Sequence, residues 1–208
     1  MGGRGTLDGA AESTVPGSTA RGSLPAWQSA TVSSMSHSYL LVIGDAAPLA
    51  WVLTDRRMAF PALRKHQASA LEVGDELLIY TTRGCFGNPG RDLGRVMALA
   101  TVKTRVKDLG EPVVFSDRRY TSGCELDIKG LTPLRTGVEL QPLVAQMHAF
   151  PDPKSWSVHL RRPLVPLDEH DATLLKERLA PLLEPPGRQL DAYQQVAAKR
   201  RVKAPAAP

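Results

Sequence analysis

The residues best suited to bind or attack a ligand gather in one polar loop. Between the apolar runs at 77–82 and 96–102 the sequence reads RGCFGNPGRDLGR, thirteen residues dominated by glycine and arginine. This loop is too long for a tight hairpin turn and too polar for a core segment. Arg83 and Arg91 are of the type that binds phosphate, whereas the glycines either admit a ligand close to the backbone or form turns.

Nucleophilic catalysis has little support in the residue pattern. Cys85 could pair with His66, His148 or His159 as nucleophile and base, but no spacing joins them. The loop also lacks the Gly-Lys-Ser/Thr ending of a phosphate-binding P-loop. Cys85 and Cys124 stand far apart, without CxxC or Cys/His spacing, which argues against a zinc site. The sequence therefore predicts no catalytic residue, no cofactor and no metal.

Composition divides the chain into a folded unit and two tails. Residues 1–37 are mostly small or polar, so they cannot offset the entropy of ordering, and we expect a disordered tail. Residues 185–208 end in the basic, proline-rich stretch KRRVKAPAAP and form a second predicted tail. Because most of the formal net charge of +5 falls there, this tail should attract a polyanion. The folded unit is predicted to span 38–184.

The sequence also bears on location. No apolar run approaches the roughly 20 residues that span a bilayer, and the N-terminus lacks the apolar segment of a secretory signal. Two widely separated cysteines fit a reducing compartment. We therefore expect a cytoplasmic protein without a membrane partner, and the oligomeric state stays open.

Short β-prone runs alternate with short helices along the predicted folded unit. Strands are expected at 39–44, 58–60, 76–82, 94–106, 124–131 and 157–160. Helices are expected after Asp45, from Gly137, and from Asp168 through 183. Because strands dominate, the sequence predicts an α+β fold: a small, strongly bent sheet or partial barrel with short helices packed outside.

The order of these elements resembles the EVE domain family of the PUA-like superfamily, whose relatives include YTH, ASCH and SRA domains. The resemblance rests on YLLVIG, a helix containing Trp51, the strand LEVGDELLIY, the strand GRVMALATV, and SWSVHLRRPLVPL followed by a capped helix. It covers roughly residues 39–183. It implies a PUA-like pseudo-barrel that binds nucleic acid through a modified or flipped base.

The sequence departs from the family pattern in two segments. Where the family commonly shows a Trp-Gly-Val-like segment, this chain has Met58 to Phe60, and Met58 could still supply a polarizable apolar wall. Where the family often shows Tyr-His-Ser, the chain has Tyr80, Thr81 and Thr82. These departures leave the identity of the base and the choice between DNA and RNA open.

The resemblance implies that the end of strand 76–82 and the following loop border a ligand cleft. The base-binding residues implied in this way are Met58, Phe60, Tyr80, Thr81, Thr82, Arg83 and Trp156. Arginines predicted to bind phosphate beside this cleft are Arg56, Arg57, Arg91, Arg161 and Arg162. We therefore expect a non-enzymatic nucleic-acid-binding domain. The alternatives are a hydrolase or transferase that uses the same cleft, and a protein-interaction module.

Overall fold

The computed structural model describes residues 36–203, so the predicted disordered tail at 1–37 lies almost entirely outside the described residues. Its strands are β1 (Ser38–Ile43), β2 (Arg57–Phe60), β3 (Glu76–Thr81), β4 (Arg95–Val102), β5 (Lys107–Phe115), β6 (Arg118–Leu131), β7 (Val138–Glu139) and β8 (Leu164–Leu167). The α-helices are α1 (Ala46–Asp55), α2 (Lys65–Ala68), α3 (Glu169–Leu179) and α4 (Pro186–Lys203). The 3₁₀ helices are η2 (Ala62–Arg64), η3 (Gln141–Gln146), η4 (Trp156–Arg161) and η5 (Ala180–Leu182).

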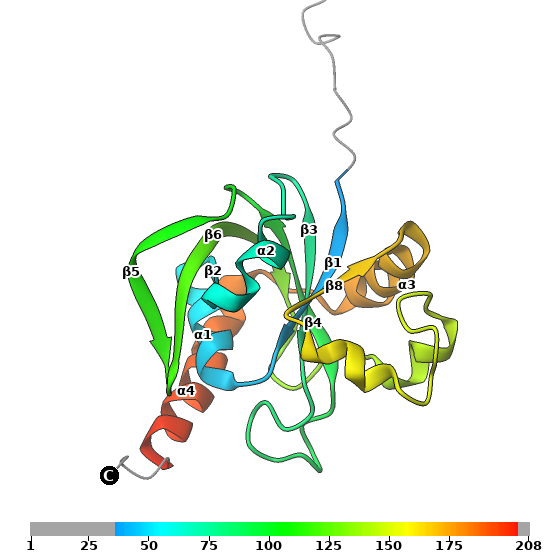
Figure 1. The fold of residues 1–208 in the computed structure, drawn as a ribbon. Helices are drawn as coiled ribbons and strands as arrows, with labels where there is room; N and C mark the ends of the chain where they lie inside the picture. Colours follow the sequence, from blue (N-terminus) through cyan, green and yellow to red (C-terminus); the bar gives the residue numbers. More distant parts are fainter. Residues whose placement is uncertain (1–35, 204–208) are drawn as a thin grey trace, which may run out of the picture. The chain divides into compact units, whose positions relative to one another are not determined.

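One mixed, strongly curled sheet is the frame of the fold (Figure 1). Its strand order is β2-β6-β4-β3-β1-β8, while β5 pairs with β6 and β7 pairs with β4. Strands β1 and β3 are parallel, whereas the neighbouring pairs are antiparallel. Register shifts within the β3–β4 and β4–β6 pairs bend the sheet. The curled sheet with short helices outside it confirms the predicted α+β fold class.

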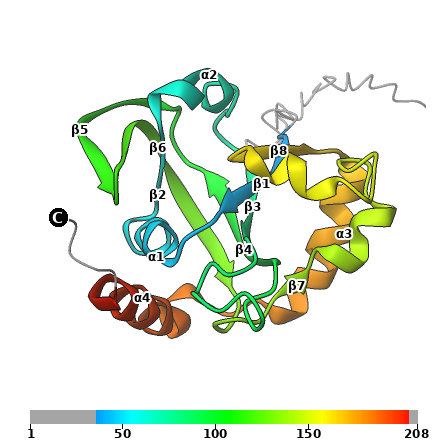
Figure 2. The ribbon, with the colours of Figure 1, turned by 60° about the horizontal axis from the view of Figure 1, so that its bottom comes forward.

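The two central strands β1 and β3 are buried on both faces. Leu41 and Ile79 belong to a hydrophobic cluster that includes residues of α1 and α4. Leu40 and Tyr80 belong to a second cluster, which includes residues of α3. Figures 1 and 2 show α1 and α4 together on one side of the sheet and α3 on the other. Burial on both faces explains why these strands read as continuous apolar runs in the sequence.

Both predicted helix caps are confirmed. The Asp45 side chain accepts a hydrogen bond from the backbone N–H of Ala47 at 2.9 Å and caps α1. The Asp168 side chain accepts one from the N–H of Asp171 at 2.8 Å and caps α3. None of the helices described in residues 36–203 is long and apolar enough to cross a membrane.

Several predicted strand limits differ from the structure. The strand predicted at 157–160 is wrong, because this segment forms the 3₁₀ helix η4, and the closing strand β8 follows it. The strand predicted at 94–106 ends at Val102, and β5, which follows it, was not predicted. The segment from Gly137 enters strand β7 before it turns into η3. Four to six residues of alternating polarity fit a strand or a tight helical turn equally well.

Helix α4 extends the fold beyond the boundary predicted at residue 184. Tyr193 is only 1% exposed, meets the Phe86 ring edge-on with centroids 6.1 Å apart, and donates a hydrogen bond to the carbonyl oxygen of Thr132 at 3.0 Å. Ala197 is buried in the same cluster. The prediction that a tail begins at residue 185 is therefore wrong for the described part of this segment. Its few apolar residues, placed at helical spacing among charged ones, are enough to dock it.

Candidate nucleic-acid interface

The predicted site residues fall into two groups at opposite ends of strand β4. Arg95 begins this strand and Val102 ends it, so at about 3.3 Å per residue the two ends lie roughly 23 Å apart. One group is Met58, Phe60, Arg56 and Arg57, beside the Val102 end. The other group, at the Arg95 end, is Tyr80, Thr81, Thr82, Arg83, Arg91, Trp156, Arg161 and Arg162. The structure does not bring all of them to one opening.

Six arginines, here called the arginine rim, line the Arg95 end of the sheet. The members of the rim are Arg83, Arg91, Arg95, Arg135, Arg161 and Arg162. Backbone hydrogen bonds from Val42 N to Pro163 O at 2.9 Å, and from Thr82 N to Ile43 O at 3.0 Å, place their segments side by side. Four of the six are exposed and form no ion pair within residues 36–203.

The loop 82–94 of the rim is a folded structure and belongs partly to the core. Buried Asp92 accepts hydrogen bonds from the backbone N–H of Asn88 at 2.7 Å and from Nε of Arg135 at 2.8 Å. The Arg135 guanidinium also lies 5.3 Å from the centre of the Phe86 ring. Phe86 and Cys85 turn inward and are buried. The loop therefore anchors the sheet end as well as carrying exposed arginines.

Little surface beneath the rim is open to a ligand. The space between Thr81, Phe86 and Met97 has no room for a water molecule. Tyr80 is 2% exposed, and burial raises the pKa of its hydroxyl to about 12. A methyl group on Gly94 would stand 2.1 Å from that hydroxyl oxygen, so Tyr80 is packed tightly under the strand.

The other predicted base-binding residues at the rim add little exposed surface for a ligand. These residues are Trp156, Thr81 and Thr82. Trp156 is half-buried, and its ring meets Phe150 edge-on with centroids 5.9 Å apart. Thr81 is buried, and its hydroxyl donates to the Arg95 carbonyl oxygen at 3.4 Å, while Thr82 is partly exposed. The rim therefore combines exposed arginines with aromatic rings that are mostly occupied by packing.

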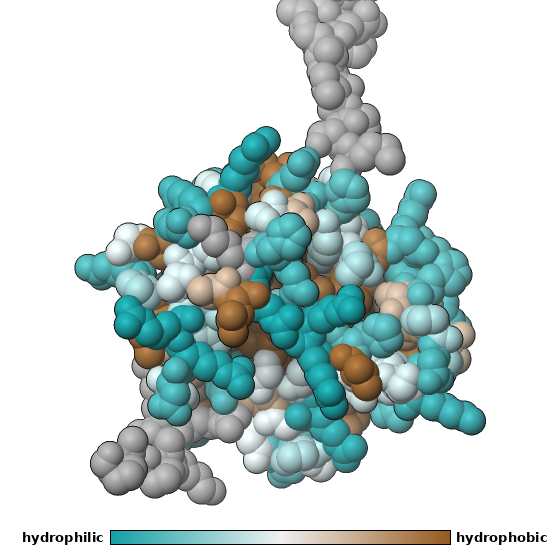
Figure 3. Space-filling view, viewed as in Figure 1, coloured by the Kyte–Doolittle hydropathy of each residue, from teal (hydrophilic) through white to brown (hydrophobic). Residues whose placement is uncertain are grey.

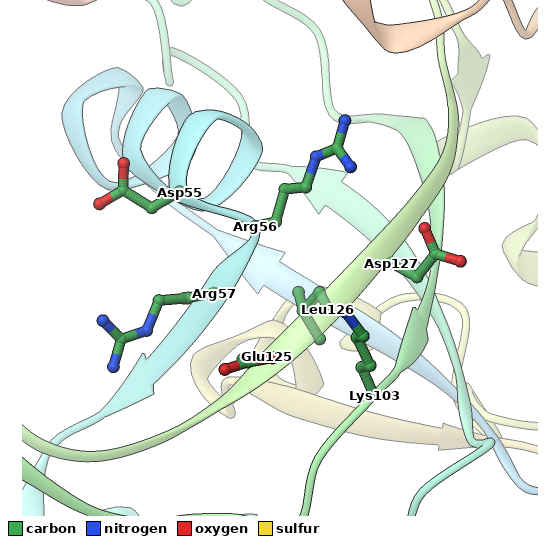
Figure 4. A pocket seen from close by; sticks show the side chains of 7 residues that line it. All are labelled: Asp55, Arg56, Arg57, Lys103, Glu125, Leu126 and Asp127. Atoms are coloured by element: carbon green, nitrogen blue, oxygen red, sulfur yellow. The ribbon is translucent and has the colours of Figure 1, made fainter.

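The opposite end of β4 carries an open hollow of about 250 Å³. Its lining residues are Asp55, Arg56, Arg57, Lys103, Glu125, Leu126 and Asp127 (Figure 4). Arg56 adopts a left-handed conformation, with φ of 51°, and ends α1. Figure 4 shows the Arg56 and Arg57 side chains extending in different directions from this turn. The hollow is smaller than a typical drug-sized pocket.

Charge in this hollow is mixed. The Lys129 ammonium, hydrogen-bonded at 2.6 Å, holds the pKa of Asp127 below its ordinary value, and Arg56 and Lys103 act in the same direction. Asp127 therefore stays ionised and is already paired. Arg56, Arg57 and Lys103 form no ion pair within the described residues, although Asp55 and Glu125 share the hollow with them.

Three half-buried aromatic residues meet at the β5–β6 hairpin, where Tyr120 lies on the face of β6 opposite to Glu125 of the hollow. The Phe115 ring meets Trp51 of α1 and Tyr120 of β6 edge-on, with centroids 5.8 and 5.7 Å apart. The turn between these strands leads directly into Arg118 and Arg119, which are exposed. Aromatic rings beside free cations are the combination that nucleic-acid-binding surfaces use for stacking and phosphate contact.

Met58 and Phe60 lie behind this hairpin. Their strand pairs Met58 with Cys124 and Phe60 with Ser122, so by the two-residue period of a strand they share a face with Tyr120. Met58 is buried and Phe60 has no exposed surface. They therefore belong to the core beneath this face and do not line an open pocket. The buried Ser122 hydroxyl has no hydrogen-bond partner within the described residues.

We call this second site the corner interface. It consists of Trp51, Arg56, Arg57, Lys103, Phe115, Arg118, Arg119 and Tyr120. Phe115, Arg118 and Tyr120 share one face of the sheet, whereas Arg57 and Arg119 lie on the other. The sequence predicted only Arg56 and Arg57 among these. The signal that could have found the others is FSDRRY, a short stretch in which two aromatic residues flank a polar turn with paired arginines.

The surface seen in Figure 3 is mostly hydrophilic. Apolar patches on it are small and separated by polar side chains. A broad apolar area, which would favour docking of a protein partner, is not visible on this face.

Comparisons with known proteins show distant structural likeness only. No family model matches the sequence, and no curated protein matches it. A hypothetical protein from Leishmania major has 15% identity and a TM-score of 0.43, covering 69% of this chain and 94% of that chain. A protein from Pseudomonas putida has 16% identity and a TM-score of 0.44, covering 68% and 99%. Human THYN1, solved in complex with 5-methylcytosine-containing DNA, has 13% identity and a TM-score of 0.40, covering 68% and 96%. At this level the likenesses carry no functional assignment.

Proposed function

We propose that this protein binds nucleic acid at the corner interface, without catalysing a reaction on it. Phosphates are contacted by Arg56, Arg57, Arg118 and Arg119, and an unstacked base rests on the aromatic rings of the hairpin. The resemblance to EVE domains supports a finer form of the proposal, in which the contacted base is modified or flipped out of a helix.

One observation carries the proposal: half-buried aromatic rings share one face of the β5–β6 hairpin with an exposed arginine that forms no ion pair within residues 36–203. Phe115 and Tyr120 contact each other edge-on, and the exposed Arg118, which pairs with Phe115, shares their face. A base can stack on an aromatic ring whatever its identity, because every base has a flat face. The rim supports nucleic-acid binding less well, because Tyr80 beneath it is buried and the space between Thr81, Phe86 and Met97 has no room for a water molecule.

Buried thiols support binding without catalysis. Cys85, the candidate nucleophile of the alternative enzyme hypothesis, has no exposed surface. Burial also raises the pKa of Cys124 to about 12, so this thiol is not ionised near neutral pH. Only the thiolate is a strong nucleophile.

Two variants of equal charge change test where phosphate is bound. In the corner variant, Arg56, Arg57, Arg118 and Arg119 are replaced by Gln. In the rim variant, Arg83, Arg91, Arg161 and Arg162 are replaced by Gln. Because each lost phosphate contact lowers the salt slope by about 0.9 on duplex DNA, the corner variant should lose about 3 to 4 units and the rim variant less than about 1. The measurement is affinity at several salt concentrations for single-stranded and duplex DNA and RNA.

The salt slopes of the two variants distinguish the two sites. A loss of slope in the rim variant alone would move the interface to the opposite end of β4 and refute the corner assignment. Equal slopes in both variants and the parent would reject both sites. Thermal melting of each variant ensures that a change in binding is not a change in folding.

Tyr120→Ala tests the stacking contact. Stacking on an aromatic ring is worth about 1 to 3 kcal/mol per base, so affinity should fall by about 5- to 150-fold. Tyr120→Phe keeps the ring and should bind like the parent. Trp156→Ala, which removes a half-buried aromatic residue at the rim, is the matched control and should leave affinity unchanged.

The affinities of the same variants for plain and methylated oligonucleotides give their base preference. If Trp156→Ala weakens binding and Tyr120→Ala does not, the base contact lies at the rim. If the parent prefers a modified base and Tyr120→Ala loses only that preference, the finer form of the proposal stands.

A further inference from the structure

Two histidines and two aspartates meet where the chain leaving η3 passes the first turn of α3. His148, Asp168, His170 and Asp171 each offer a nitrogen or oxygen atom, and these atoms all lie within 4.8 Å of one another. The imidazole rings of His148 and His170 stack with centroids 4.6 Å apart and planes 21° apart. Nδ1 of His148 lies 2.6 Å from Oδ2 of Asp168, and Nδ1 of His170 lies 3.1 Å from Oδ1 of Asp171.

Backbone hydrogen bonds fix the two carboxylates in place. Asp171 is fully buried and accepts the N–H groups of His148 at 2.9 Å and Ala149 at 2.8 Å. Oδ1 of Asp168 accepts the N–H of Asp171 as the helix cap, so its other oxygen is the one that faces His148. The fold itself thus joins two segments far apart in sequence and holds their side chains together.

The donor set has a distinct chemical preference. Imidazole nitrogens with carboxylate oxygens suit zinc and neighbouring first-row metals, whereas magnesium and calcium take mainly oxygen ligands. Two neutral imidazoles and two carboxylates also balance the charge of a divalent ion. Zinc ligands at about 2.0 to 2.2 Å in a tetrahedron stand about 3.4 Å apart, so ligand atoms that lie up to 4.8 Å apart need to close by up to about 1.4 Å.

The dipole of helix α3 opposes a cation at its N-terminal end, but the nearby carboxylates outweigh this effect. The N-terminal end of α3 carries a partial positive charge of about half a unit. Three carboxylates, those of Asp168, Glu169 and Asp171, lie in the cap and first turn. Their summed negative charge is several times larger than the dipole charge.

We infer that His148, Asp168, His170 and Asp171 form a binding site for a divalent transition metal, with zinc as its occupant. The ion joins the segment leaving η3 to the start of α3. The site lies at the end of β8 opposite to Arg161 and Arg162, so it is separate from the rim. It is also separate from the corner interface, because β8 and β2 stand at opposite ends of the strand order. It does not depend on the proposed function.

Zinc titration of the full chain, prepared without a histidine tag, tests the inference. The parent should bind one zinc ion with a dissociation constant below about 100 µM, and zinc should raise its melting temperature because it binds only the native state. His148→Ala, His170→Ala and Asp168→Asn should each weaken zinc binding at least about tenfold. Asparagine caps helices as well as aspartate, so Asp168→Asn keeps the fold while it removes a charged ligand.

Two controls separate coordination from general electrostatics. Glu169→Gln removes the same charge from the same helical turn, and His66→Ala removes an exposed histidine elsewhere. Both should bind zinc like the parent. The inference is overturned if the parent binds no zinc in this range, or if the double variant His148→Ala/His170→Ala binds zinc as tightly as the parent. It is also overturned if Glu169→Gln weakens zinc binding as much as Asp168→Asn does.

Discussion

A chain that ends at Glu184 should lose most of its folding stability, because it lacks the helix that covers α1. The deleted segment carries Tyr193, one of the largest fully buried side chains of the fold, together with buried Ala197. Leu190 and Val196 pack against the same cluster. A domain of this size is stable by only about 5 to 15 kcal/mol, and exposing this cluster removes a large part of that. Circular dichroism and thermal melting of the shortened chain measure the loss.

Tyr193→Ala isolates the main contact of this helix. Replacing a buried aromatic residue with alanine costs about 3 to 5 kcal/mol, which corresponds to a fall of about 6 to 20 °C in melting temperature. Gln195→Ala changes an exposed residue of the same helix and should stay within about 0.5 kcal/mol of the parent. A shortened chain that melts like the full one would show that α4 is an accessory, as the sequence had predicted.

Gly137→Ala should destabilise the protein by about 2 to 6 kcal/mol, because the position combines two separate penalties. Gly137 has a φ of +113°, a conformation that residues with a side chain rarely adopt. A methyl group there would also stand 2.4 Å from the carbonyl oxygen of Val96, which is backbone and cannot swing aside. Relief requires β7 to separate from β4, where Val138 pairs with Val96.

Gly187→Ala is the matched control for this change. Gly187 lies in the first turn of α4, and an added methyl group meets no atom within 4 Å. Alanine should be neutral there or stabilising by up to about 1 kcal/mol. Chemical denaturation of both variants gives the two free energies, and similar values for Gly137→Ala and Gly187→Ala would contradict the argument.

Local signals in the sequence predicted local structure well. The apolar run YLLVIG, the cap residue Asp45 and the capped helix at Asp168 each depend on a few neighbouring residues, and each is confirmed. The β5–β6 hairpin escaped prediction because its sequence contains Gly110, Pro112 and many charges, which are typical of a loop. It forms a ladder because β6 continues from the sheet and offers a free edge.

The composition of the site could not be predicted, because it depends on which way each strand faces. Tyr80 and Met58 are both apolar residues of strands, yet they belong to different hydrophobic clusters. A strand buried on both faces gives no sequence signal for which face a residue takes. Arg57 and Arg91 were expected at one cleft, but the length of β4 separates them.

The position of β1 in the sheet has a consequence for synthesis on the ribosome. Its parallel partner β3 follows soon in the chain, but its other neighbour, β8, ends at Leu167. At about 5 to 20 residues per second, β1 waits on the order of ten seconds for that neighbour to be translated. Throughout this interval one edge of its apolar run YLLVI has no native partner, and an open strand edge is a template for pairing with another chain.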